Sequence, residues 1–226
     1  MQRIATLLDG LTEMAKYAGG TVPQESDPQY QEWVGWLSDG QEDQAERGFW
    51  SRLLTKAEEI DITTDEDTII LPDDFHKRNG IWAFGVDEVD WSEPNNEVNQ
   101  TLFVTKNEDG EWVCTFRGFT PTEDTTAELW YFRHPGILAE PDDLFILDGK
   151  ASVFYALTEY FRQAGELGSL DDARNEYNNR FDEALGKEMI PTPQELLAYK
   201  PYFKYAGYKT SNEKQFYTRY RNRRRF

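Results

Sequence analysis

Four adjacent pairs of acidic residues are the first features of this sequence whose type and spacing could do chemistry. They are Asp73-Asp74, Asp87-Glu88, Asp142-Asp143 and Asp171-Asp172. Two carboxylates at a suitable separation can act as acid and base in a hydrolase. With 42 acidic residues in the chain, however, such pairs also arise by chance. Asp172 fits a helix cap, and Asp73-Asp74 follow Pro72 in a turn-like position, so a carboxylate hydrolase is kept only as an alternative.

The other reactive residue types are few. Cys114 lies between Trp112 and Phe116 in a predicted strand, which favours a small buried hydrophobic residue over a nucleophile. His76 and His134 stand alone in the sequence, a pattern typical of packing or surface residues. Asp65 and Asp67 lack the spacing and central glycine of a calcium-binding loop. None of the metalloprotease, nucleophile-elbow, phosphate-loop or dinucleotide motifs occurs, so we predict no enzyme, no cofactor and no metal site.

The charge distribution is more informative, because it separates an acidic body from a basic C-terminal arm. Residues 200–226 hold nine Lys/Arg and one acid, a net +8, whereas residues 1–199 hold 15 Lys/Arg and 41 acids, a net −26. The arm also holds eight aromatic residues, unlike a disordered solvating tail. We therefore predict that its tip docks on an acidic partner, through Phe216, Tyr217, Arg219, Tyr220, Arg221, Arg223, Arg224, Arg225 and Phe226.

Helical periodicity marks both ends of the acidic body. Apolar residues recur every three or four positions over residues 3–18, and Gly19-Gly20 would end that helix. A second helix is predicted from Ser26-Asp27-Pro28 to an interruption at Asp39-Gly40, and a third over residues 42–59. Two more helices are predicted at residues 149–164 and from Ser169 to Gly186, with a short one at Pro193–Tyr199.

Between these helices, β-branched and aromatic residues predict six short strands. The predicted strands are Ile60–Thr63, Thr68–Leu71, Ile81–Val86, Thr101–Thr105, Glu111–Phe116 and Thr125–Arg133. Asn107-Glu108-Asp109-Gly110 fits a hairpin turn, and residues 87–99 fit a polar loop. Close turns between short strands favour an antiparallel meander over a parallel sheet.

The predicted fold class is therefore α+β. N-terminal helices (1–59) and a C-terminal helical hairpin (136–186) form one bundle, a β-meander (60–135) is inserted between them, and a basic arm (187–226) extends from it. The last 27 residues, if extended, reach up to about 90 Å, compared with a radius of gyration of about 16 Å for the body. An arm of that reach makes sense if it crosses to another subunit.

Composition also limits where the protein acts. A single cysteine excludes an internal disulfide and points to synthesis in a reducing cytoplasm. No apolar run is long enough to span a membrane, and residues 1–4 do not begin a signal peptide.

Several local patterns, taken in order, resemble the head-to-tail adaptor proteins of tailed bacteriophages. Gly35-Trp36-Leu37, followed by Ala45-Glu46-Arg47 and Trp50, is similar to the early helices of that family. Residues 68–75, ending in Leu71-Pro72-Asp73-Asp74-Phe75, resemble its strand and turn, and residues 127–135 resemble its last strand. The segments Ala151–Phe161 and Tyr177–Leu185 match its closing helical hairpin. The resemblance covers roughly residues 2–186, and departs at the loop 87–99 and the arm.

This resemblance implies a structural virion protein at the head–tail junction. It implies a twelve-membered ring beneath the portal, with helices around the DNA passage, a β-domain that meets tail or nozzle proteins, and an arm docked on the portal. Twelve acidic bodies would let genomic DNA pass without specific binding. A head-completion stopper and a tail-tube component are the nearest alternatives. A nucleic-acid-binding protein that uses the Arg-rich arm is an alternative of a different class.

Overall fold

The computed structural model describes residues 4–57, 60–64, 68–76, 80–86, 101–117, 124–192, 195–196 and 204–205. The chain divides into two compact units. The helical unit comprises residues 1–56, 74–79 and 130–192, and the sheet unit comprises residues 57–73, 80–129 and 193–226. The polar loop expected at 87–99 lies outside the described residues, as does most of the helix expected at Pro193–Tyr199.

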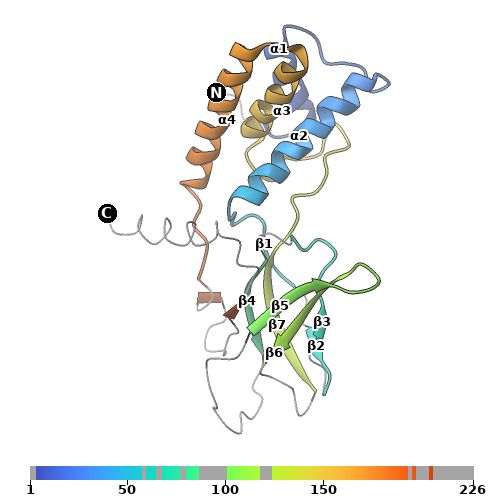
Figure 1. The fold of residues 1–226 in the computed structure, drawn as a ribbon, viewed down its shortest axis with the longest axis vertical. Helices are drawn as coiled ribbons and strands as arrows, with labels where there is room; N and C mark the ends of the chain where they lie inside the picture. Colours follow the sequence, from blue (N-terminus) through green and yellow to red (C-terminus); the bar gives the residue numbers. More distant parts are fainter. Residues whose placement is uncertain are drawn as a thin grey trace, which may run out of the picture. The chain divides into compact units, whose positions relative to one another are not determined.

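The helical unit contains four α-helices (Figure 1): α1 (Leu7–Ala18), α2 (Pro28–Arg47), α3 (Gly149–Ala164) and α4 (Leu167–Leu185). A capping box of Thr6 and Asp9 begins α1, so this helix starts later than the predicted residue 3. Gly19, with φ of 72°, ends α1 as predicted, because this left-handed conformation suits glycine. Asp27 caps α2 ahead of Pro28, and α3 has the predicted bounds.

The predicted interruption at Asp39-Gly40 is wrong, because α2 runs through both residues. Gly40 is there for a packing reason. A Cβ atom at this position would lie 2.9 Å from Ser152 Cα and 3.0 Å from Ser152 O on α3. The glycine therefore permits a close approach of two helix backbones, and it does not break the helix.

The predicted helix over residues 42–59 is also wrong beyond Arg47. Gly48 adopts an extended backbone there, and the indole Nε1 of Trp50 donates to Gln44 O at 2.7 Å. Strand β1 (Leu54–Lys56) then pairs antiparallel with β7 (Thr125–Phe132), through Phe132, Tyr131 and Trp130. Trp50 and Leu53 are buried although neither lies in a helix.

The start predicted for the last helix, with Ser169 as its capping residue, is three residues too late. Helix α4 begins at Leu167 with Glu166 as its N-cap, so Ser169 lies inside the first turn and does not open the helix. The Ser169 hydroxyl donates to the Glu166 carboxylate at 3.2 Å. Gly186 ends the helix as predicted.

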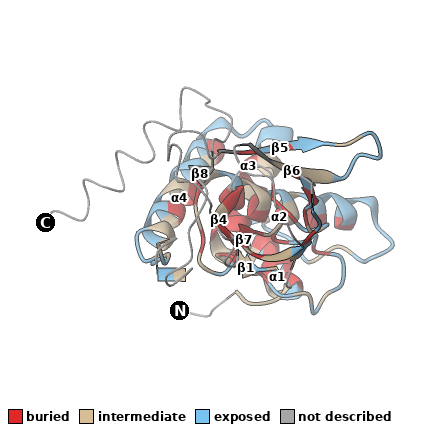
Figure 2. Cartoon of the chain, turned by 90° about the horizontal axis from the view of Figure 1, so that it is seen from below, coloured by how far each residue is buried: buried red, intermediate tan, exposed pale blue. Residues whose placement is uncertain are grey.

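Apolar side chains of all four helices form one core in the helical unit. Its fully or almost fully buried members include Leu7, Leu11, Met14, Trp33, Leu37, Val153, Leu157 and Tyr177. Figure 2 shows buried residues along the inward faces of α2 and α3. The periodicity that predicted the helices thus marks the residues that pack together.

The strands lie close to their predicted positions. The sheet unit holds β2 (Ile60–Ile62), β3 (Thr68–Ile70), β4 (Ile81–Val86), β5 (Thr101–Lys106) and β6 (Trp112–Arg117), together with the first part of β7. The β5–β6 hairpin turns at Asn107–Gly110 as predicted, with Gly110 at φ of 85°. One face of β3, β6 and β5 is core, because Ile69, Cys114 and Val104 are buried.

The strand order is more complex than a simple meander. One four-stranded sheet has the order β1-β7-β2, with β4 also paired to β7, and the other has the order β3-β6-β5-β8. Of the strand pairs that the structure describes, β5–β6 alone joins strands consecutive in the chain. The predicted antiparallel pairing is confirmed for β1–β7, β2–β7, β3–β6 and β5–β6, whereas β5 pairs in parallel with β8 (Lys204–Tyr205).

Candidate functional site

The acid pairs within the described residues have structural roles. The Asp74 carboxylate accepts a hydrogen bond from the Tyr131 hydroxyl at 2.7 Å. Asp143 accepts backbone N–H groups of Ala139 and Glu140 at 2.7 and 2.8 Å, and these bonds hold the pKa of the carboxyl below its usual value. Each carboxylate thus stabilises a turn or strand end.

The remaining acids singled out in the sequence are exposed or lie outside the described residues. Asp171 and Asp172 are exposed on α4 beyond its first turn, so the helix-cap role expected for Asp172 is wrong. Asp87-Glu88 and the acids at 65 and 67 lie outside the described residues. Across the described part of the chain, no group of three His, Cys, Asp or Glu side chains could hold a metal ion.

The single thiol is buried and unreactive. Cys114 is 0% exposed in β6, and burial raises its pKa to about 12. At neutral pH it is a protonated thiol that packs as a small apolar group, in agreement with its sequence context.

The structure brings together two histidines that are far apart in the sequence. His76 Nε2 lies 3.1 Å from Glu42 Oε1, within hydrogen-bond distance, and His134 Nε2 lies 2.8 Å from Glu42 Oε2. The two imidazole centroids are 6.0 Å apart. Contact with both histidines holds the pKa of Glu42 below its usual value despite partial burial.

The hydrogen bonds around His134 favour a structural role over a metal site. The Gly136 N–H donates to His134 Nδ1 at 3.1 Å, so the proton of the neutral ring lies on Nε2, facing Glu42. A metal would need the lone pair of that same nitrogen. The cluster of Glu42, His76 and His134 therefore ties α2 to the segments at both histidines. Nothing in the spacing of single histidines could have revealed it.

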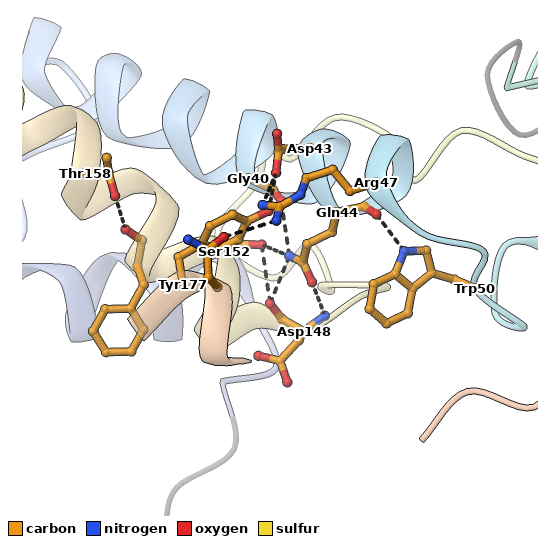
Figure 3. Close-up of polar contacts among 11 residues, drawn as sticks. Gly40, Asp43, Gln44, Arg47, Trp50, Asp148, Ser152, Thr158 and Tyr177 are labelled. Carbon is orange, nitrogen blue, oxygen red and sulfur yellow. Dashed lines mark hydrogen bonds and ion pairs between the residues drawn. The ribbon is translucent and has the colours of Figure 1, made fainter. Parts of the chain in front are cut away.

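Buried amides fix the segment that leads into α3 (Figure 3). Gln44 Nε2 donates to Asp148 O at 3.2 Å and to Ser152 Oγ at 2.9 Å, and Gln44 Oε1 accepts from Asp148 N at 3.2 Å. One turn earlier, Gln41 Oε1 accepts from Ile146 N at 2.8 Å. Gln41 and Gln44 are both fully buried. Their Oε1 atoms accept from backbone N–H groups that would otherwise be removed from water without a hydrogen-bond partner.

The Arg47 side chain lies where α2 and α4 pack together (Figure 3). The Arg47 guanidinium lies 5.2 Å from the Tyr177 ring centroid and 4.4 Å from that of Phe181, and it pairs with Asp43 at 3.3 Å. Tyr177 donates its hydroxyl proton to Asp43, and its burial together with that bond raises the pKa of the phenol. Arg47 Nη2 also donates to Asn178 Oδ1 at 3.0 Å, so Arg47 joins the last turn of α2 to α4 by a hydrogen bond as well as by packing.

The structure describes little of the arm predicted to dock on a partner. The docking residues Phe216–Phe226 lie outside the described residues. Within the arm, Lys204 and Tyr205 form β8, which pairs in parallel with Thr101 and Leu102 of β5. This part of the arm therefore adds a strand to a sheet of its own chain.

Comparison with known proteins supplies the identity. No curated protein matches the chain. No helix within the described segments is long and apolar enough to cross a membrane. The family model described as "SU10 adaptor protein" matches residues 1–223. The match spans the loop at 87–99 and extends past residue 186 into most of the basic arm. With nearly its whole length matched, the chain belongs to the SU10 adaptor family of phage head-to-tail adaptor proteins.

Proposed function

We propose that this protein is a structural subunit of the phage neck that forms a ring between the portal and the tail or nozzle proteins. The observation that carries the proposal is the family match over residues 1–223. The hydrogen-bonded carboxylates of Asp74 and Asp143, the buried thiol and the buried glutamines are compatible with it, since each has a structural explanation.

The proposed ring has twelve copies and surrounds the passage for genomic DNA. The body carries a net charge of −26, and phosphate-rich DNA is repelled by such a surface, so the genome would pass without specific binding. Like charge also opposes association of the copies themselves. Contacts that link neighbouring copies must offset this repulsion, and the basic arm is the segment of opposite sign.

The arm tip is proposed to dock on the portal. Five arginines at 219, 221, 223, 224 and 225 can each bind a carboxylate in a bidentate manner, while Phe216, Tyr217, Tyr220 and Phe226 fill apolar pockets. We expect deletion of residues 215–226 to leave a folded protein that does not join the portal. Native mass spectrometry with purified portal measures this directly.

Two control variants separate charge from geometry. Replacing the five arginines with lysine keeps the charge but loses bidentate binding, and should weaken docking by at least tenfold. Replacing the exposed Arg174 of α4 with glutamine should leave docking unchanged. Unimpaired assembly by the deletion variant would refute the docking proposal. A six-membered assembly would favour a tail component over an adaptor.

A further inference from the structure

The edge of β5 accepts the C-terminal arm as an added strand. On one side, β5 pairs with β6 along all six of its residues, from Thr101 to Lys106. On the other side, the arm residues Lys204 and Tyr205 pair in parallel with Thr101 and Leu102. A strand edge presents unpaired N–H and C=O groups, so it binds any extended segment that can reach it.

The pairing that holds the arm within the chain is weak enough to be exchanged. It extends over two residues on each strand, and parallel pairs are slightly less stable per residue than antiparallel ones. The arm of a neighbouring copy would make the same backbone contacts, so exchange costs little free energy, as in domain swapping.

Reach and charge favour a neighbouring copy as the partner of this edge. The eleven residues 193–203, which join the helical unit to β8, span up to about 36–40 Å when extended. A neighbouring acidic body attracts the basic arm as strongly as its own body does. In a ring of acidic copies, an exchanged arm makes this attraction a contact between neighbours, whereas an arm folded on its own chain holds no two copies together.

We propose that the β5 edge is a strand-acceptor site for residues 204–205, and that in the assembled ring it takes this strand from the adjacent copy. The exchange rests on the proposed ring. It would link neighbouring subunits through the sheet unit, and leaves the tip at 216–226 available for a different partner.

Cysteine pairing across β5 and β8 tests the exchange. Cα atoms of neighbouring strands are about 4.8 Å apart, within the range that a disulfide bridges. In a Cys114→Ala background, which removes the one native thiol, Thr101→Cys and Lys204→Cys are introduced into separate chains. The two chains are mixed, assembled on purified portal and oxidised. We expect an interchain disulfide in the ring and less than a tenth as much in the mixture without portal.

The controls separate the possible failures. Thr68→Cys on β3, the far edge of the same sheet, should not bridge to Lys204→Cys in the ring. In the free monomer, the chain carrying both Thr101→Cys and Lys204→Cys should close within itself. A ring that contains intrachain disulfides alone overturns the exchange and keeps the ring. No disulfide in monomer or ring overturns the acceptor site itself. A chain that never forms a ring overturns the proposed function together with the exchange.

Discussion

At the scale of single residues, burial decides what each reactive group does. Cys114 has the chemistry of a nucleophile, but its position on the core face of β6 keeps it protonated. Glu42 has the chemistry of a general base, but two histidines hold its carboxylate. In both cases the neighbours convert a potentially reactive side chain into a stabilising one.

The first prediction concerns the thiol of Cys114. Its folded pKa of about 12 lies above the unfolded value of 9.0, so at pH 8.5 the native protein presents almost no thiolate. Alkylation of native protein by iodoacetamide at this pH should be at least about a hundredfold slower than in denaturant. The raised pKa also adds stability below pH 9, which is lost as pH rises toward 12. Equal alkylation rates in the two states would contradict the buried position.

The second prediction concerns the contact of Glu42 with both histidines. Glu42→Gln should lower the free energy of unfolding by about 1–2 kcal/mol at pH 7, because an amide has one acceptor oxygen where the carboxylate has two. The folded pKa of Glu42 is depressed, so its contribution is complete above the usual value of 4.5 and is lost as pH falls through the folded pKa. Urea unfolding should therefore show a smaller difference in the free energy of unfolding between the protein and Glu42→Gln below pH 4 than at pH 7. Glu32→Gln, at an exposed residue of the same helix, is the control. If the difference in the free energy of unfolding did not change with pH, the ionised carboxylate of Glu42 would not be its cause.

At the scale of elements, α2 organises the helical unit. Gln41 and Gln44 bind the segment before α3, and Gly40 allows the backbone of α3 to approach closely. In the last turn of α2, Arg47 packs against α4. One long helix can serve all three contacts because residues three or four apart share a face. The local sequence Asp39-Gly40 predicts a helix break, but the packing of α3 against Gly40 explains the glycine within a continuous helix.

The third prediction tests the close approach at Gly40. Alanine in place of glycine gains about 0.5–1 kcal/mol of intrinsic helix stability. At Gly40, however, the new Cβ would meet Ser152 backbone atoms at 2.9 and 3.0 Å, so Gly40→Ala should destabilise the fold by about 1–3 kcal/mol. At Gly35, in the same helix, a Cβ would meet nothing within 4 Å, so Gly35→Ala should be neutral or stabilising. Thermal melts of both variants give the comparison. Similar melting temperatures would show that α2 and α3 are not in close contact at Gly40.

At the scale of the whole molecule, the opposite charges of body and arm dominate. The net charge of −18 combines −26 on residues 1–199 with +8 on residues 200–226. From this charge we expect the acidic body to repel DNA and the arm to attract it. The molecule also repels its own copies unless salt or the arm intervenes.

The fourth prediction follows from that balance and separates the adaptor from a nucleic-acid-binding protein. The isolated peptide 195–226 should bind duplex DNA, with affinity falling steeply as salt increases. The full chain should show no retention of DNA at about 150 mM salt, because the acidic body opposes it. Gel-shift titrations at several salt concentrations measure both. Strong, salt-dependent binding by the full chain would favour the nucleic-acid-binding alternative.

The sequence by itself determined the α+β class, the positions of the six predicted strands and those helix ends that a cap or glycine marks, because these depend on local periodicity, caps and turns. Residues 81–86 and 149–164 form the elements that their patterns predict. It also placed the chain in its family through motifs spread along residues 35–185.

Tertiary structure alone decided the features that depend on contacts between distant residues. The continuity of α2 at Gly40, the strand at Leu54–Lys56, the crossed strand order and the Glu42–histidine cluster all arise from partners far away in the chain. Local propensity is worth a few tenths of a kcal/mol per residue, and burial and strand pairing outweigh it. For the same reason, no local pattern could show that the arm adds a strand to β5.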